Sequence, residues 1–265
     1  MIRLAVHCDS QPDAFNPALI DNKLFYNEKM EISVSRVNRS KEACRRSYNR
    51  LSRWYDLLAG RTEKKYRDRG LEKLGAQPGE RILEIGFGTG HCLAALARAV
   101  GSDGQVIGVD LSDGMTAIAR KRLLQYGLSD RVDLRRGDAS DLDFLEADSM
   151  DGVFMSFTLE LFDLPDIACV LLECHRVLKP AGRLAVVCMT KTDPPGMAVR
   201  LYEWFHEHMP DYADCRPIFA QPLIRKSGFV MEDVSISSMW GLPVEILLAR
   251  KVDRKYPLDG SVAKA

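Results

Sequence analysis

Long apolar runs are missing from this chain of 265 residues, and so are paired cysteines and a net charge. The longest apolar stretches, such as residues 167–172, fall far short of the ~20 residues that a membrane-spanning helix needs. The first seven residues contain only a short apolar run, so we expect no secretory signal there. Lysine plus arginine (37) equals aspartate plus glutamate (37), which argues against a protein that binds polyanions through its overall charge.

The seven cysteines form no C-x-x-C pair and show no paired spacing. In a chain of this length, that pattern is typical of reduced, mostly buried thiols in the cytosol. We therefore expect a cytoplasmic protein without a disulfide framework and without a metal site. Hydrophobic residues make up 46% of the chain, which is enough to bury a sizeable core.

Charge is distributed unevenly along the chain. Between Arg36 and Lys73 there are 13 basic and 5 acidic residues, a surplus of 8, and the remaining residues carry the opposite surplus. Two interpretations of the segment 36–73 stay open. It forms either a solvated helix surface, which is the usual role of such runs, or a peripheral contact with an anionic membrane.

Hydrophobic periodicity divides the chain into segments with different patterns. The predicted domains are a partly ordered arm at 1–40, a helical cap at 41–75, and a ligand-binding domain at 76–255 with an insertion at 190–224. In the insertion, Met197 and Leu201 begin a further apolar stripe at helical spacing.

Within the ligand-binding domain, seven short apolar strands are separated mostly by amphipathic helices. This alternation predicts an α/β fold with a Rossmann-like, doubly wound and mostly parallel sheet. The last two strands, 230–237 and 244–251, are separated only by a short turn. They must therefore pair antiparallel, because a parallel pair needs a long crossover.

The most informative stretch is 82–90, which reads ILEIGFGTG. It lies where a predicted strand ends and a helix begins, which is where open α/β sheets bind ligands. Gly86, Gly88 and Gly90 follow the spacing G-x-G-x-G, and His91 stands where the dinucleotide fingerprint G-x-G-x-x-G has its third glycine. The spacing disfavours a dinucleotide, and a tight turn without a ligand remains the alternative.

Acidic residues follow the next two predicted strands. Asp110 comes 24 residues after Gly86, at a position where a carboxylate can accept hydrogen bonds from both hydroxyls of a ribose. Asp138 follows the third strand, where a second carboxylate can accept from the exocyclic amine of adenine. Because these features follow three successive strands, we expect them to bind one nucleoside together.

The series ILEIGFGTG, VIGVDLSDGM, GDASDL, DGVFMSFTLE and RVLKPAGRLAVV resembles the motifs of class I S-adenosylmethionine-dependent methyltransferases, over roughly residues 75–250. The resemblance implies a seven-stranded sheet that ends in an antiparallel pair, S-adenosyl-L-methionine as cofactor and S-adenosyl-L-homocysteine as product. The cofactor contacts that it implies are Gly86, Gly88 and Gly90 at the methionine part, Glu84 positioning that loop, Asp110 at the ribose, Leu111 and Met115 beside the adenine, Asp138 and Ala139 at its edge, and Ser156 and Phe157 near the methyl group.

The stretch 48–56, which reads YNRLSRWYD, is similar to the opening of the ubiquinone/menaquinone methyltransferase branch and its phospholipid N-methyltransferase relatives. The quinone branch usually has an Arg-Asn pair after the fourth strand, whereas this chain has Leu-Glu-Leu-Phe at 159–162. Tyr48 and Tyr55 either form an aromatic lid that tolerates a sulfonium cation or only pack the cap against the domain.

The predicted activity is transfer of a methyl group to a nitrogen, oxygen or carbon atom of a small-molecule or lipid-like acceptor. Glu160, His206 and Tyr212 are the candidates for a general base where the acceptor must lose a proton. One alternative is a nucleic-acid methyltransferase, but the Asp-Pro-Pro at 193–195 follows the fifth strand and lacks the expected aromatic residue. A non-catalytic protein that binds S-adenosylmethionine is the other alternative.

Overall fold

The structure is a computed structural model, and it describes residues 60–191, 196–197, 199–202 and 215–252. The predicted arm at 1–40 and the Asp-Pro-Pro motif lie outside the described residues. So do four residues with predicted roles: Tyr48, Tyr55, His206 and Tyr212. Their roles and the predicted domain boundaries remain predictions.

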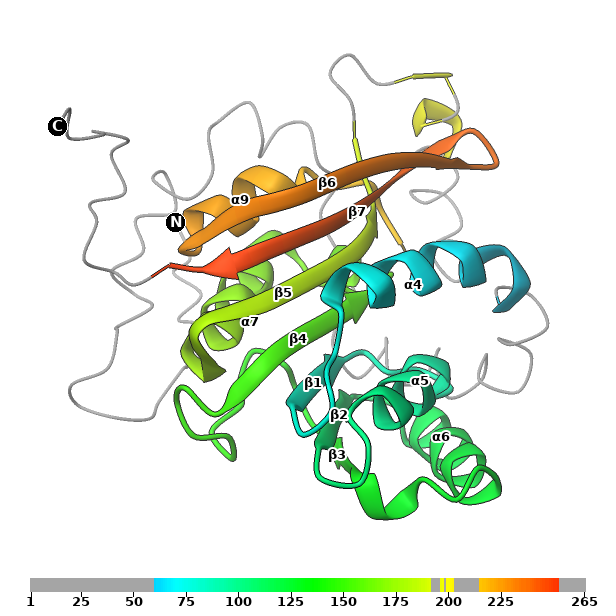
Figure 1. Cartoon of the computed structure of the whole chain (residues 1–265). Helices are drawn as coiled ribbons and strands as arrows, with labels where there is room; N and C mark the ends of the chain where they lie inside the picture. The colour runs from blue at the N-terminus through cyan, green and yellow to red at the C-terminus, as the bar shows by residue number, and fades with distance from the viewer. Residues whose placement is uncertain (1–59, 192–195, 198, 203–214, 253–265) are drawn as a thin grey trace, which may run out of the picture.

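A seven-stranded sheet forms the centre of the fold, in the order β3-β2-β1-β4-β5-β7-β6 (Figure 1). The first five strands are parallel, and β7 is antiparallel to both of its neighbours. The strands are β1 (Arg81–Ile85), β2 (Gln105–Asp110), β3 (Val132–Arg136), β4 (Met150–Ser156), β5 (Leu178–Met189), β6 (Phe229–Met239) and β7 (Leu242–Lys251). The predicted fold class, including the antiparallel C-terminal pair, is confirmed.

Helices cover both faces of the sheet. One face packs against α4, α5 and α6, and the other packs against α7 and α9. The helices are α4 (Gly60–Leu74), α5 (His91–Ala99), α6 (Asp113–Gln125), α7 (Leu164–Val177) and α9 (Ala220–Lys226), with 3-10 turns η2 (Ser129–Arg131) and η3 (Leu159–Leu161). No helix within the described ranges is long and apolar enough to cross a bilayer.

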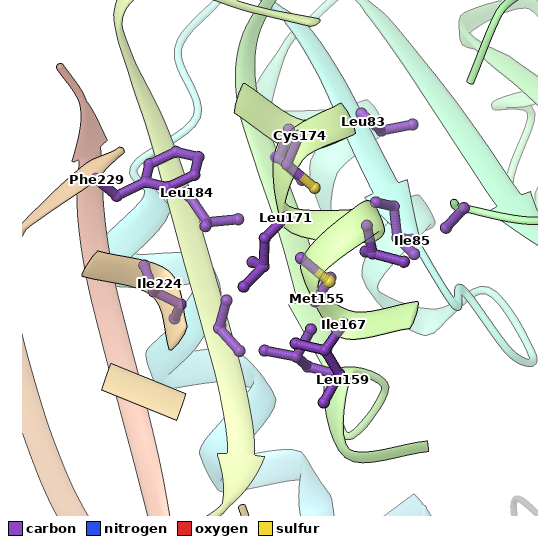
Figure 2. Close-up of a cluster of buried hydrophobic side chains, with 14 of the residues drawn as sticks. Leu83, Ile85, Met155, Leu159, Ile167, Leu171, Cys174, Leu184, Ile224 and Phe229 are labelled. Atoms are coloured by element: carbon purple, nitrogen blue, oxygen red, sulfur yellow. The ribbon is translucent and has the colours of Figure 1, made fainter. Parts of the chain in front are cut away.

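The central strands are buried on both faces, which is why they read as nearly continuous apolar runs. On the α7 side, Ile85 from β1 and Met155 from β4 are at most 1% exposed, and they belong to one cluster with Leu171 and Cys174 of the helix (Figure 2). This cluster fixes β1 and β4 side by side, so that the loops that follow them lie at the same edge of the sheet.

Helix α4 is the described part of the predicted cap, and it lies directly on the sheet. A Cβ at Gly70 would come within 2.5 Å of Cγ2 of Val187, so only glycine permits this approach. One turn earlier, in the middle of the helix, the buried Tyr66 donates its hydroxyl hydrogen to the carbonyl oxygen of Ser238. Near its end, the side chain of Leu74 lies beside Gly152 of β4. The helix therefore runs from the carboxyl edge of the parallel strands toward their amino edge.

Two local features differ from the sequence prediction. A Pro-Ala-Gly sequence such as that at 180–182 is typical of a boundary between helix and strand, but β5 already begins at Leu178, which pairs with Met150. The segment is an irregularity within the strand pairing, with Ala181 at φ 60°. In the insertion, Met197 and Leu201 are 87% and 67% exposed, so this part of the apolar stripe does not join the core.

Candidate functional site

The loop between β1 and α5 has left-handed backbone at each of its three glycines. Gly86, Gly88 and Gly90 have φ values of 68°, 51° and 81°. A Cβ at Gly86 would lie 2.3 Å from Thr158, and one at Gly90 would lie 2.8 Å from Cβ of Ala119, so both glycines permit close packing. Around Gly88, by contrast, the described residues leave the Cβ position open. The loop therefore exposes backbone on one side while its ends are fixed.

Asp110, at the end of β2, joins three loops. Its Oδ2 accepts a hydrogen bond from N of Gly88 at 2.9 Å, and its Oδ1 accepts one from N of Ser112 at 2.8 Å. Its carbonyl oxygen accepts from N of Gly137, which follows β3, at 3.1 Å. Burial raises the pKa of the Asp110 carboxyl group, while the N–H groups of Ser112 and Gly88 oppose that shift. Each carboxylate oxygen retains capacity for a further hydrogen bond.

The residues expected near an adenine lie on the loops after β2 and β3. Asp138 accepts a hydrogen bond from N of Ser140 at 3.0 Å, which shapes its own turn, and Ala139 is buried. Met115 is also buried, and its N–H donates to Oγ of the helix-capping Ser112 at 3.1 Å. Asp138 and Ala139 lie on the loop after β3, which the hydrogen bond from N of Gly137 to the carbonyl oxygen of Asp110 joins to the end of β2.

Glu84, on β1, is a buried carboxyl group directly before the glycine loop. It is 3% exposed, and its Oε2 has no hydrogen-bond partner among the described residues. Burial raises its pKa well above the ordinary value, the nearby Asp110 adds to the shift, and Arg67 of α4 opposes it. A buried carboxyl oxygen without a partner is unfavourable unless a ligand or a proton satisfies it.

The chain after β4 packs against the glycine loop. Phe157 has φ 51°, is buried, and meets the ring of Tyr66 edge-on with 6.3 Å between ring centroids. Thr158 donates its hydroxyl hydrogen to the carbonyl oxygen of Ser156 at 3.0 Å and lies 3.4 Å from that of Gly86. The structure therefore brings the Ser156–Thr158 stretch beside the loop that follows β1.

Glu160 lies on turn η3 and is fully buried, with 0% exposure. Its Oε1 accepts a hydrogen bond from N of Met189 at 3.0 Å, and its Oε2 has no partner within the described part of the chain. Burial raises the pKa of this carboxyl group to about 8; the backbone N–H groups of Glu160 and Met189 oppose that shift, Glu63 adds to it, and Arg216 opposes it to a smaller extent. Glu160 therefore changes its charge in the neutral to mildly alkaline range.

Two charged residues of α4 face the same region, although the sequence suggested only a charged helix. Glu63 and Arg67 form an ion pair at 3.3 Å, with side chains only 14% and 12% exposed. Burial raises the pKa of Glu63 to about 7, and Arg67 limits that shift. Sequence reasoning also gave no role to Thr158 or Arg216, because neither belongs to a periodic pattern.

Comparison with known families and sequences gives one consistent result. A family profile described as "Methyltransferase domain" matches residues 82–182. A demethylmenaquinone methyltransferase of Symbiobacterium thermophilum is 28% identical over 238 residues, which are 78% of this chain and 92% of that protein. A demethylmenaquinone methyltransferase of Bacillus velezensis is 31% identical over 182 residues, which are 68% of this chain and 74% of that protein.

Among solved structures, the crystal structure of the [4+2]-cyclase SpnF is similar, with a TM-score of 0.66 and 20% sequence identity. The match covers 82% of this chain and 98% of that chain. At this level of identity the similarity shows the fold alone, and the cyclase illustrates that one fold serves different reactions.

Proposed function

Since this chain belongs to the class I S-adenosylmethionine-dependent methyltransferases and methylates a small molecule, we propose which residues hold the cofactor and serve the acceptor. The loops after β1, β2 and β3 bind S-adenosyl-L-methionine, and the turn after β4 serves the acceptor. The main support for this proposal is a pair of hydrogen bonds. The backbone N–H groups of Gly88 and Gly137 both donate to Asp110, and these two bonds join the three loops.

S-adenosylmethionine would supply, from its sulfonium sulfur, a methyl group that bonds to the acceptor atom in line as the carbon–sulfur bond breaks and S-adenosyl-L-homocysteine leaves. In our proposal, the glycine loop holds the methionine part and Asp110 accepts hydrogen bonds from the ribose hydroxyls. The predicted contacts with the adenine come from Leu111 and Met115 beside the ring and from Asp138 and Ala139 at its edge. Ser156 and Phe157 border the methyl group.

Three observations support the fit of these residues to the cofactor. The Cβ position at Gly88 is open, so a ligand can approach the loop backbone there. Asp110 can accept further hydrogen bonds, although each of its oxygens already has one donor. The buried Oε2 of Glu84 has no partner among the described residues, and a cationic group of the cofactor nearby would favour the ionised form of this carboxyl group.

For the acceptor, we propose an electron-rich aromatic hydroquinone of the demethylmenaquinol type, because both curated relatives described above are demethylmenaquinone methyltransferases. A hydroquinone becomes a better nucleophile when its hydroxyl loses a proton. In our proposal Glu160 takes that proton. Met189 holds one of its carboxyl oxygens, and the other has no partner within the described residues, which supports this role. His206 and Tyr212 remain alternative bases.

A hydroquinone with a long apolar chain is found in membranes, so the basic segment 36–73 gains a role in this proposal. Its described part, α4, exposes Lys64, Lys65 and Arg69. Such cations attract an anionic lipid surface. We propose peripheral contact of a cytoplasmic protein with the membrane, with a solvated helix surface as the alternative.

A labelled-methyl screen tests the acceptor. The purified protein is incubated with S-adenosylmethionine labelled in its methyl group and with separate quinols, phospholipids, amines, phenols and thiols. The proposal predicts label in the quinol, and a large loss of rate in Glu160→Gln but not in the control Glu146→Gln, whose side chain is exposed. If label appears only in another class of compound, that class replaces the quinol as the proposed acceptor. If Glu160→Gln transfers methyl groups at the wild-type rate, Glu160 is excluded as the base.

A further inference from the structure

Arg216 is a charged residue in the interior, with 0% of its side chain exposed. It lies in the later part of the insertion 190–224, shortly before α9. Removing a guanidinium group from water is strongly unfavourable unless partners compensate for the lost hydration. Its Nη2 donates a hydrogen bond to the carbonyl oxygen of Phe162 and lies 3.9 Å from Oδ1 of Asp163. These partners directly follow turn η3, which carries Glu160.

The segment of Arg216 and the side chain of Glu160 are fixed at the same end of β5. The N–H of Met189 donates to Oε1 of Glu160 at 3.0 Å. The carbonyl oxygen of Met189 accepts from N of Ile218, two residues after Arg216, at 3.2 Å. In addition, N of Lys191 donates to the carbonyl oxygen of Ile218 at 3.2 Å. One strand end therefore sets the place of both the carboxyl group and the cation.

The groups that act on Glu160 come from several elements. Glu63 of α4 opposes the ionisation of Glu160, in the same direction as burial, whereas Arg216 favours it. On the neighbouring strands, Cys188 of β5 pairs in register with Glu245 of β7. Burial raises the pKa of the Cys188 thiol, and Glu160 and Glu245 raise it further. Arg216 thus supplies a positive charge in a region with several buried carboxyl groups.

We propose that Arg216 is a positioning residue for methyl transfer: it fixes the turn that carries Glu160 and supplies the positive charge against which that carboxyl group ionises. The inference rests on the proposed function, because it assigns a partner to the proposed base. Arg216 itself touches neither substrate nor cofactor in this account.

Two variants separate charge from packing. Arg216→Gln keeps a donor for Phe162 and removes the charge, whereas Arg216→Lys keeps the charge. The pH dependence of kcat is measured with a short-chain alkyl naphthoquinol as acceptor. The rising limb is expected to move upward by about one pH unit in Arg216→Gln and to stay in place in Arg216→Lys. A lower kcat with an unmoved limb in Arg216→Gln would show a merely structural role and overturn the proposal.

A second measurement needs no activity. Unfolding by urea is compared at pH 6 and pH 9.5 for Arg216→Gln, with Glu160 intact and in a Glu160→Gln background. The charge lost at residue 216 should lower the urea midpoint more at pH 9.5 than at pH 6, and this difference should disappear in the Glu160→Gln background. An equal decrease of the urea midpoint of Arg216→Gln at both pH values would contradict the proposal. Failure of this variant to fold at pH 6, where Glu160 is neutral, would contradict it as well. If the screen finds no acceptor, this result still stands.

Discussion

The backbone N–H of Gly88 donates a 2.9 Å hydrogen bond to Oδ2 of Asp110, and this bond ties the loop after β1 to the end of β2. Gly88 has left-handed backbone with φ 51°, a conformation that glycine adopts at no steric cost. A small change in the loop is therefore expected to alter the position of the carboxylate proposed to bind the ribose.

Gly88→Ala is expected to weaken binding of S-adenosylmethionine by at least about tenfold, because the new Cβ occupies the open side of the loop. The strained φ of alanine should also lower the free energy of unfolding by about 1 kcal/mol. Gly79→Ala is the matched control, since Gly79 has φ 84° and an equally open Cβ position outside the site. Calorimetry that shows equal loss of affinity in both variants would contradict the assignment.

Gly70→Ala tests the packing of α4. Alanine stabilises a helix interior by about 1 kcal/mol relative to glycine. Here the added Cβ meets Val187 at 2.5 Å and Phe154 at 3.0 Å, and overpacking of a core costs about 1–3 kcal/mol. We expect net destabilisation in urea unfolding, whereas Glu72→Ala on the exposed side of the helix should be neutral or stabilising. A more stable Gly70→Ala would show that α4 is not packed closely on the sheet.

Glu160→Gln tests the raised pKa of this carboxyl group. Its pKa rises from 4.5 to about 8 on folding, so the unfolded chain loses the proton first. The contribution of Glu160 to stability is therefore complete below pH 4.5 and is lost as the pH rises to 8, by at most about 5 kcal/mol at about 1.4 kcal/mol per pKa unit.

Urea unfolding between pH 5 and pH 9 measures that loss. Glu160→Gln should make the decline of stability with pH shallower, leaving the shares of Glu63, whose pKa is raised to about 7, and of Glu84, whose pKa burial also raises. The exposed Glu72→Gln should decline as the wild-type protein does. If Glu160→Gln also declines like the wild type, Glu160 is not the group responsible.

Vesicle flotation tests the membrane contact. Anionic vesicles should bind the protein in low salt and release it in high salt, with about 1 kcal/mol for each well-placed cation. The double variant Lys65→Gln/Arg69→Gln should bind more weakly, and Arg225→Gln/Lys226→Gln on α9 serves as control. If the wild-type protein shows no salt-sensitive binding, the membrane contact is excluded, and the basic segment 36–73 is interpreted as a solvated helix surface.

Much of the fold and of the cofactor side of the site follows from the sequence. Alternation of apolar strands with helices predicts a parallel sheet, and carboxyl ends of parallel strands meet at one edge. Gly88, Asp110 and Asp138 therefore had to approach one another once the three strands were recognised, and Asp110 joins their loops in the structure.

The acceptor side was harder to predict, because it depends on contacts between distant segments. Arg216 reaches Phe162 across 54 residues of sequence, and Thr158 packs on Gly86 across 72 residues, without a local pattern that indicates either pair. Proline and glycine usually mark boundaries, yet at 180–182 they lie inside β5, because Leu178 still pairs with Met150.

The most direct test of the account measures S-adenosylmethionine binding by calorimetry in wild-type protein, Asp110→Ala and Asp103→Ala. Asp103 is an exposed aspartate before the opposite end of the same strand, so it controls for the change of charge. We predict that Asp110→Ala loses most of the affinity while Asp103→Ala binds as the wild type does. Wild-type affinity in a folded Asp110→Ala would contradict the proposal that the loops joined by Asp110 hold the cofactor.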